Sequence, residues 1–345
     1  SGNRLARKPQ ITYFISLCQI APTKIKNGQS SSRSGKPSFQ EDFEENQTLS
    51  ASREQKLGVF CALAAYGIWG VVPVYFKAVG HVSPLEILSH RVIWSVPLTA
   101  LLIFLAKDWS GLKKSLCSEG VLRTLFVSAL LVTTNWLIFI YAIVTGRILQ
   151  ASLGYYINPL VNVLLGIVFL RERLRPLQFM AVLLAAAGTA NITMHYGRFP
   201  WIALSLAFSF GIYGLLRKTV RIEAVNGLFV ETALISPLAL GYLIYLAKNG
   251  GLAFVSSDHR TALALFMAGA VTTFPLVWFT SAARRLRYST MGLLQYLAPS
   301  LMFLLAVLRY GETFTLVHLV TFGCIWAGLA LFLIDSFYLQ AGRHI

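Results

Sequence analysis

Charged side chains are scarce in this sequence. Asp, Glu, Lys and Arg together make up 13% of the 345 residues, which is about half the share usual in a soluble domain. Hydrophobic residues make up 56%, and the mean hydropathy is +0.63. Uncharged apolar runs long enough to cross a bilayer recur along the chain. The composition therefore excludes a set of ordinary soluble domains and indicates one polytopic membrane domain.

Sequence signatures of catalysis and metal binding are also missing. The four cysteines have no CxxC or ligand-like spacing, and the chain contains no GxxxxGK[ST], HExxH or GxSxG. Nothing therefore indicates a disulfide framework, a zinc site, an ATP-driven pump or a serine hydrolase. A membrane-embedded enzyme would need His or Asp clustered near one face, and the sequence has no such cluster. We expect no enzyme, no catalytic residue, no metal and no cofactor.

Ten apolar segments are predicted to be membrane-spanning helices, because each is long enough to cross the hydrocarbon core. They lie at roughly Leu57–Phe76, Pro84–Ala106, Val121–Val144, Ile148–Leu170, Pro176–His195, Phe199–Leu216, Ala224–Ala247, Thr261–Ala283, Tyr288–Tyr310 and Thr315–Ile334.

Basic residues predict the orientation of these spans. The net charge of +16 resembles that of a nucleic-acid binder, but 9 of the 30 Lys and Arg lie in residues 1–56 and most others lie in short loops. Loops on one side would carry 13 of them and loops on the other side 6. Since the more basic loops of a membrane protein face the cytoplasm, both termini are expected there, and no nucleic-acid partner is expected.

The two halves of the chain resemble each other at a spacing of 140 residues. The matching pairs are Arg147 and Arg287, Tyr156 and Tyr296, Pro159 and Pro299, Glu172 and Glu312, and Gly188 and Gly328. A fixed spacing indicates a duplicated unit. Because each half has five spans, an odd number, the second copy must enter the membrane from the opposite side. Such inverted repeats are typical of carriers that work by alternating access.

These features divide the chain into four parts. Residues 1–55 are polar and rich in Ser and Gln, which predicts a disordered or non-native extension, with a targeting segment as the alternative. The first five-helix repeat is expected at 56–196, the second at 197–338, and a short cytoplasmic tail at 339–345.

Four ionisable residues within the spans are candidates for a substrate or ion pathway: Glu86, His90, Arg91 and Glu231. Such groups are costly at membrane depth unless they are paired or hydrated, and they usually line a path. Glu86 and His90 lie four residues apart on one helix face. A structural ion pair is the alternative for Arg91, and a protonated or Arg-paired structural glutamate is the alternative for Glu231.

Polar and aromatic residues near the middle of the spans predict a cavity. The candidates are Trp94, Asn135, Trp136, Tyr155, Tyr156, Asn158, Trp278, Gln295 and Tyr296. Simple helix-to-helix bonding or packing is the alternative for each. Pro159, Pro275 and Pro299 are expected to kink their helices. Glu172 and Glu312 are expected to cap helices or anchor loops, and the small residues around Gly188 to form a packing surface or a dimer face.

Several segments resemble EamA-type transporters, a family of the drug/metabolite transporter superfamily. They are Arg91–Ser95, Ser152–Leu160, Arg171–Arg173, Ala207–Gly211 and Thr290–Tyr296, and the resemblance runs from about Lys56 to about Tyr338. It implies a ten-helix permease of the bacterial inner membrane, built from two EamA repeats.

Together, the residues and the resemblance predict a secondary transporter for a small metabolite or drug-like molecule. We expect lipid around it, a coupling proton as an option, and a monomer or homodimer. A non-transporting membrane sensor or assembly scaffold is the alternative function.

Overall fold

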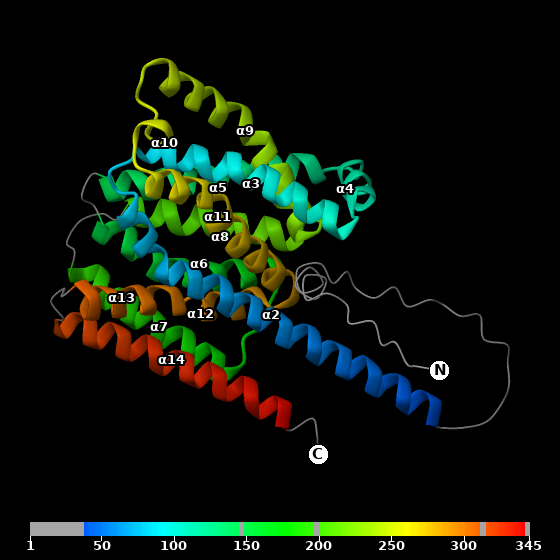
Figure 1. Ribbon diagram of the computed structural model, residues 1–345. Coiled ribbons are helices and arrows are strands. Elements are labelled where there is room, and N and C mark those ends of the chain that lie inside the picture. Colours follow the sequence, from blue (N-terminus) through cyan, green and yellow to red (C-terminus); the bar gives the residue numbers. More distant parts are fainter. Residues whose placement is uncertain (1–37, 145–147, 196–200, 311–314, 342–345) are drawn as a thin grey trace, which may run out of the picture.

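The computed structural model describes residues 38–144, 148–195, 201–310 and 315–341, and within these ranges the chain forms helices and loops without strands. The helices lie side by side in one bundle (Figure 1). Their bounds are α2 Ser38–Ala78, α3 Pro84–Ala106, α4 Trp109–Leu116, α5 Val121–Val144, α6 Ile148–Leu170, α7 Pro176–His195, α8 Trp201–Thr219, α9 Ala224–Lys248, α10 Ala253–Ser256, α11 His259–Arg285, α12 Tyr288–Leu294, α13 Leu297–Tyr310 and α14 Leu316–Ala341.

The ten expected segments coincide with helices of the structure, and the ninth is divided between α12 and α13. Among the described residues, six helices are long and apolar enough to cross a membrane, and two shorter apolar helices accompany them. The bundle is therefore that of an all-α membrane protein.

Helix α2 differs from its predicted segment because it begins at Ser38. Residues 38–55 thus continue the first span as helix, although they belong to the stretch expected to be disordered or non-native. The reason is local: from Gln40 to Gln55 the chain has no Gly or Pro and is rich in Glu and Gln, which are good helix formers. Residues 1–37 and the end of the expected tail lie outside the described residues.

The outer surface of the bundle is apolar. Phe104, Leu238 and Leu308 are 65%, 74% and 80% exposed, and many other large apolar side chains are exposed on the same helices. A surface of this kind is far larger than the apolar patches of a soluble monomer. It fits contact with lipid.

The helices of the first half pack on those of the second in pairs. Helix α3 packs on α9, α6 on α12, and α7 on α14. Helix α8 packs on α5 and α6 of the first half. In the same way, α2 packs on α11 and α13 of the second half. The core therefore lies between the two halves of the chain, and the buried face of each half packs mainly on helices of the other half.

The α7–α14 contact is close because each helix contributes a glycine. A Cβ on Gly188 would lie 2.8 Å from the carbonyl oxygen of Thr321, and a Cβ on Gly328 would lie 2.8 Å from that of Ala181. Since residue 188 faces 321 while 181 faces 328, the two helices run antiparallel. Gly188 and Ala185 of the small-residue stretch are thus buried within one chain, whereas Ala187 and Ala190 are exposed. A dimer contact through the exposed alanines stays a prediction.

Of the three prolines expected to kink helices, Pro299 follows a break in the ninth span, whereas Pro159 and Pro275 lie in continuous helices. The ring of a helical proline collides with the carbonyl group four residues earlier, and the helix is interrupted at Gln295 and Tyr296, just before Pro299. Pro159 lies inside α6 and Pro275 inside α11, and both helices run through them without a break.

Glu172 caps the amino-terminal end of α12, as the sequence predicts. Its Oε1 accepts a hydrogen bond from the Tyr288 backbone N–H at 2.6 Å, and its Oε2 accepts one from the Ser289 N–H at 2.9 Å. A carboxylate is favourable there because the first N–H groups of a helix have no partner within it. Glu312 lies outside the described residues.

Candidate functional site

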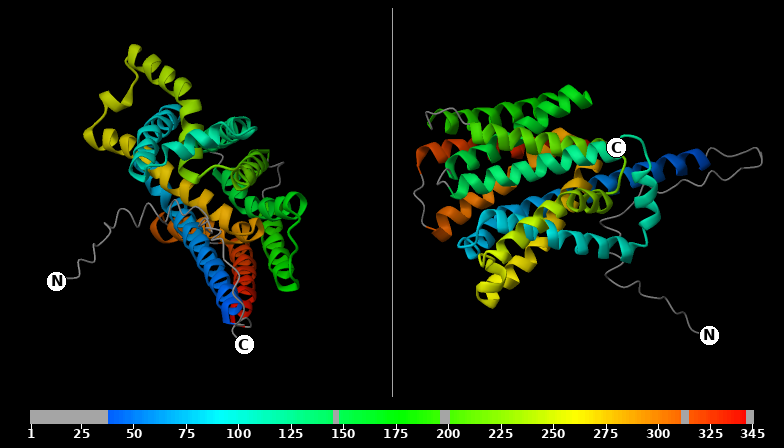
Figure 2. Two further views of the ribbon diagram at one scale, coloured as in Figure 1. Left: turned by 90° about the vertical axis from the view of Figure 1, so that its right-hand side faces the viewer. Right: turned by 90° about the horizontal axis from the view of Figure 1, so that it is seen from above.

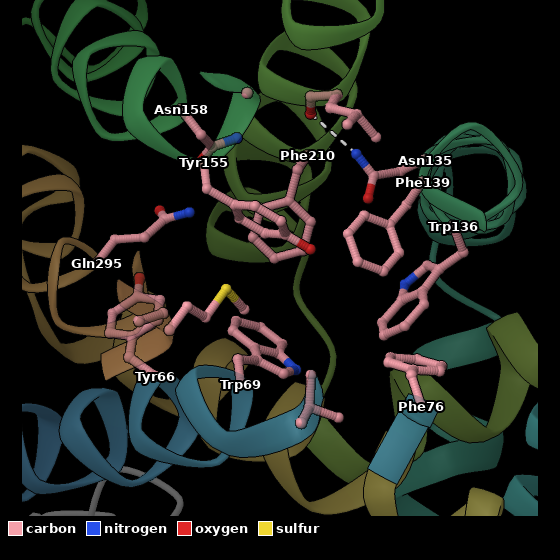
Figure 3. A pocket seen from close by; sticks show the side chains of 15 residues that line it. Tyr66, Trp69, Phe76, Asn135, Trp136, Phe139, Tyr155, Asn158, Phe210 and Gln295 are labelled. Atoms are coloured by element: carbon pink, nitrogen blue, oxygen red, sulfur yellow. Dashed lines mark hydrogen bonds between the residues drawn. The ribbon is translucent and has the colours of Figure 1, made fainter. Parts of the chain in front are cut away.

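A cavity lies between the two halves, and we call it the aromatic cavity; the space free of protein atoms there, adjoining open solvent included, is about 670 Å³. Its walls come from α2, α5, α6, α8, α13 and the break before α13 (Figure 3). The lining residues are Tyr66, Trp69, Val72, Phe76, Asn135, Trp136, Phe139, Gly154, Tyr155, Asn158, Leu206, Phe210, Gln295, Ala298 and Met302. Five of the predicted candidates are therefore brought together: Asn135, Trp136, Tyr155, Asn158 and Gln295.

The amide side chains of this cavity are held by the surrounding helices. Asn135 Nδ2 donates to the Leu206 carbonyl oxygen at 2.9 Å, and Asn158 Nδ2 donates to that of Ala207 at 2.8 Å. Gln295 Oε1 accepts a hydrogen bond from Asn162 at 2.7 Å. Apolar walls with a few fixed polar groups are the usual form of a small-molecule site.

A second cavity, the charged cavity, adjoins the first through Trp136, which lines both. Its space free of protein atoms is about 420 Å³ with the adjoining open solvent included. Arg91 and Glu231 line it, together with Thr272 of α11 and apolar residues of α3, α5 and α9. At the spacing of 140 residues that relates the two halves, Arg91 and Glu231 are equivalent positions, as are Pro97 and Pro237.

Arg91 is 2% exposed and stacks on an aromatic ring. Its Cζ lies 3.0 Å from the centroid of the Trp136 ring and 5.7 Å from that of Phe76. Its Nε donates to Thr272 Oγ1 at 2.8 Å, whereas neither Nη1 nor Nη2 has a hydrogen-bond partner among the described residues. A planar cation stacked in this way keeps its in-plane N–H groups available for a ligand.

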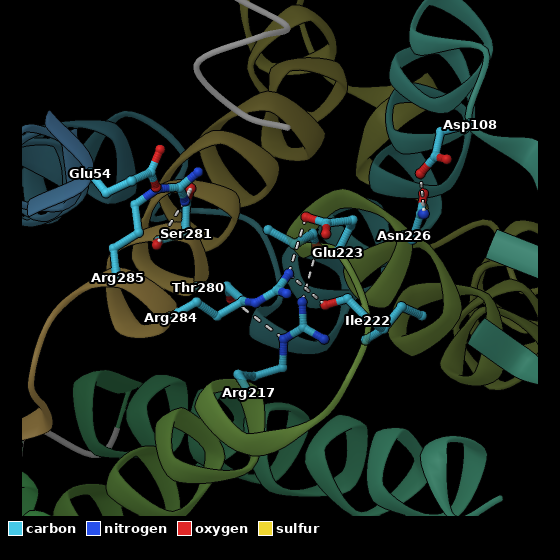
Figure 4. Close-up of polar contacts among 11 residues, drawn as sticks. Glu54, Asp108, Arg217, Ile222, Glu223, Asn226, Thr280, Ser281, Arg284 and Arg285 are labelled. Atoms are coloured by element: carbon cyan, nitrogen blue, oxygen red, sulfur yellow. Dashed lines mark hydrogen bonds and ion pairs between the residues drawn. The ribbon is translucent and has the colours of Figure 1, made fainter. Parts of the chain in front are cut away.

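Glu231 is 2% exposed and forms an ion pair with Arg217, which is 1% exposed. The distance from Arg217 Nε to Glu231 Oε1 is 3.6 Å, and Ser128 Oγ donates to the same oxygen. Arg217 also donates to the Ala224 carbonyl oxygen at 2.9 Å and to Thr280 Oγ1 at 3.4 Å (Figure 4). Glu231 Oε2 has no hydrogen-bond partner among the described residues.

Three other candidates form a separate cluster near α10. His90 Nε2 lies 3.8 Å from Glu86 Oε1, and the Trp94 indole N–H donates to His90 Nδ1 at 3.2 Å. Glu86 accepts the backbone N–H of Phe254, and the His90 ring stacks on the Phe254 ring. Glu86, His90 and Trp94 line neither cavity.

Tyr156, Tyr296 and Trp278 also lie outside the two cavities. Tyr156 and Tyr296 pack in the core against α14, where the Tyr296 hydroxyl donates to the Tyr156 carbonyl oxygen at 3.2 Å. Neighbouring residues of a helix point about 100° apart, so Tyr155 faces the cavity and Tyr156 faces away. The Trp278 ring lies 6.0 Å from that of Phe274 on the same helix.

Other lining residues were not among the predicted candidates. They include Tyr66, Trp69, Phe76, Phe139 and Phe210 in the aromatic cavity, and Thr272 in the charged one. A signal existed for three of them, Tyr66, Trp69 and Phe210, because Tyr66–Gly70 is similar to Phe210–Gly214 in the other half. Arg217 was not among the candidates either, because in the sequence it lies next to a basic loop at the end of a predicted span.

Polar contacts tie helices together at the α4 end of the bundle (Figure 4). Arg285 Nε lies 2.9 Å from Glu54 Oε2, Arg284 Nη1 lies 3.1 Å from Glu223 Oε2, and Asn226 Nδ2 donates to Asp108 Oδ2 at 2.7 Å. These contacts join α2, α11, the α8–α9 connection, α9 and the residue before α4.

The apolar exterior and the long apolar helices define an integral membrane protein, with two adjoining cavities in its interior. Residues 56–194 match the EamA-like transporter family. Among curated proteins, the chain is 50% identical to an "Uncharacterized transporter" of Vibrio cholerae, covering 84% of this chain and 96% of the relative. It is 46% identical to "Protein RarD" of Escherichia coli K12, covering 84% of this chain and 98% of that protein. The chain belongs to the RarD-like members of the EamA family in the drug/metabolite transporter superfamily.

A solved structure has the same fold. It is titled "Crystal structure of protein", with a TM-score of 0.60 and 19% sequence identity, and the likeness covers 80% of this chain and 97% of that one.

Proposed function

We propose that this protein is a secondary transporter that moves a small metabolite or drug-like molecule through the aromatic cavity by alternating access. The observation that carries the proposal is that both halves of the chain line this one cavity. The relatives from Vibrio cholerae and from Bacillus subtilis, the latter 42% identical, are named as transporters. Since the chain has no nucleotide-binding motif, an ion gradient or the gradient of the cargo drives the movement.

The transporter has ten spans in two inverted five-helix repeats. Exchanging α2, α3, α5, α6 and α7 for α8, α9, α11, α12–α13 and α14 converts the main helix pairs into one another: α5–α8 becomes α11–α2, α6–α8 becomes α13–α2, and α3–α11 becomes α9–α5. The glycine contacts obey the same exchange, because Gly188 against Thr321 becomes Gly328 against Ala181. A twofold relation of this kind supports alternating access, because the two halves can exchange conformations around a shared site.

We place both ends of the chain in the cytoplasm of a bacterium, with the bundle in its inner membrane. The first residues of α2 and the last residues of α14 leave the bundle on the same side (Figures 1 and 2), which supports this orientation. The polar contacts at the α4 end then form the cytoplasmic gate. Opening the cavity to the cytoplasm requires breaking the pairs of Arg285 with Glu54 and of Arg284 with Glu223.

Proton coupling forms a second part of the proposal. Glu231 is the proton-binding group, because it lines the charged cavity and its buried Oε2 has no hydrogen-bond partner among the described residues. Glu86 or His90 is the second site.

Transport is testable with three labelled probes of one shape: phenylacetate, phenylacetamide and phenethylamine. We expect proteoliposomes to take up at least one of them saturably, and a bulky methanethiosulfonate on Met302→Cys to reduce that uptake at least tenfold because it fills the aromatic cavity. Leu308→Cys is the matched control, since residue 308 lies on the same helix but is 80% exposed on the outside. Both substitutions are made in a chain without its native cysteines. Uptake that survives modification at position 302 would contradict the proposal.

A further inference from the structure

The charged cavity holds one positive charge more than its own residues compensate. Arg217 and Glu231 form an ion pair at 3.6 Å and balance each other. Arg91 forms no ion pair with any Asp or Glu in the described parts of the chain. Glu86 and His90, on the same helix as Arg91, pair with each other and line neither cavity. A buried cation without a counter-charge is unfavourable, and a bound anion removes that cost.

The geometry of Arg91 selects the kind of anion. The face of the guanidinium lies on the Trp136 ring, and Nε is bonded to Thr272. Nη1 and Nη2 are buried and have no partner among the described residues. Two parallel N–H donors at the edge of a planar cation match the two oxygens of a carboxylate.

The aromatic cavity, which adjoins the charged one, indicates what the remainder of the bound anion is like. Trp136 and Phe76 form one end of the aromatic cavity, and the amides of Asn158 and Gln295 lie toward the other end (Figure 3). Arg91 contacts the Trp136–Phe76 end. Arg91 itself lines the charged cavity, so a cargo that binds it through its head reaches the aromatic rings by extending its body past Trp136, the residue that the two cavities share.

We propose, on the basis of the transport function above, that the cargo is a monoanionic organic acid with an apolar or aromatic body, whose carboxylate binds Arg91 through Nη1 and Nη2. A zwitterion fits less well. Its ammonium group would have to approach Glu231 beside the Arg217 guanidinium, and the cavity would keep its uncompensated positive charge.

The test measures equilibrium binding of labelled phenylacetate to the purified full-length protein. We expect phenylacetate to bind at least tenfold more tightly than phenylacetamide, phenethylamine or phenylalanine. Arg91→Gln should weaken phenylacetate binding at least tenfold, and Arg91→Lys should weaken it less. Arg221→Gln is the control, because residue 221 is exposed in the α8–α9 connection and should bind as the parent does.

Four results would overturn the assignment: no phenylacetate binding, equal binding of phenylacetamide, unchanged binding by folded Arg91→Gln, or tighter binding of phenylalanine that depends on Glu231. If Arg91→Gln does not fold, the probe series on the unmodified protein decides. Binding without uptake by proteoliposomes would contradict transport and keep the anion site. Uptake of phenethylamine alone would keep transport and contradict the anion site.

Discussion

Arg217→Met is expected to lower the free energy of unfolding by about 3–5 kcal/mol, because it leaves the buried Glu231 carboxylate without its cation. Both side chains are almost completely buried, so bulk solvent replaces little of the lost interaction. Thermal or denaturant unfolding of the purified protein measures the change. The space around Arg217 is tight, since a Cβ on Gly227 would collide with its guanidinium.

The double variant Arg217→Met/Glu231→Gln separates the charge from the packing. Removing both charges should recover more than half of the lost stability, because the neutral Gln side chain at position 231 can be buried without a cation beside it. Arg221→Met, at an exposed position of the adjoining connection, should change stability by less than about 0.5 kcal/mol. If the double variant is as unstable as Arg217→Met, the loss comes from packing and the ion pair is not its cause.

This pair also affects how proton coupling is tested. Glu231→Gln by itself leaves the Arg217 cation buried and unpaired, so a loss of transport in that variant has two explanations. The folded double variant should show whether uptake still depends on a pH gradient. Undiminished dependence there would remove Glu231 as the proton-binding group.

Gly188→Val and Gly328→Val are each expected to destabilise the protein by about 1–3 kcal/mol, the usual cost of forcing extra atoms into a packed interface. At each position a Cβ would already lie 2.8 Å from a backbone oxygen of the facing helix, and a backbone cannot rotate away as a side chain can. Unfolding of the two variants should give similar losses, because the contacts are reciprocal.

Gly323→Val is the matched control. Residue 323 lies on α14 between the two glycine contacts, is exposed, and has no atom within 4 Å of an added Cβ. The same substitution there should raise stability slightly, by a few tenths of a kcal/mol, because Val has a higher helix propensity than Gly. A loss at 323 equal to those at 188 and 328 would contradict the close α7–α14 contact.

The sequence predicts helix positions well here because hydrophobic length and loop residues act locally. The bounds of α3, α5, α6 and α7 agree with the predicted segments, and the break before Pro299 follows from the geometry of proline. The early start of α2 is not predicted, because residues 38–55 have the polar composition of a disordered segment and helix propensity alone is a weak signal.

Which side chains of a helix point into a cavity is harder to predict, because the answer depends on the rotation of the helix and on partners far along the chain. Tyr155 and Tyr156 are neighbours in sequence, yet one lines the aromatic cavity and the other packs on α14. The sequence could identify Glu231 as an unusual group in a span, but its Arg217 partner only becomes evident when α8 and α9 are packed together.

The central claim is that two oppositely oriented halves share one chamber. Its most direct test is cysteine labelling of intact cells with a membrane-impermeant maleimide, in a chain without native cysteines, using Arg173→Cys before α7 and Leu316→Cys at the start of α14. Both residues are exposed, and α7 and α14 are antiparallel. The account predicts that position 316 reacts in intact cells and that position 173 reacts only after the membrane is permeabilised. Labelling of both positions from the same side would contradict it.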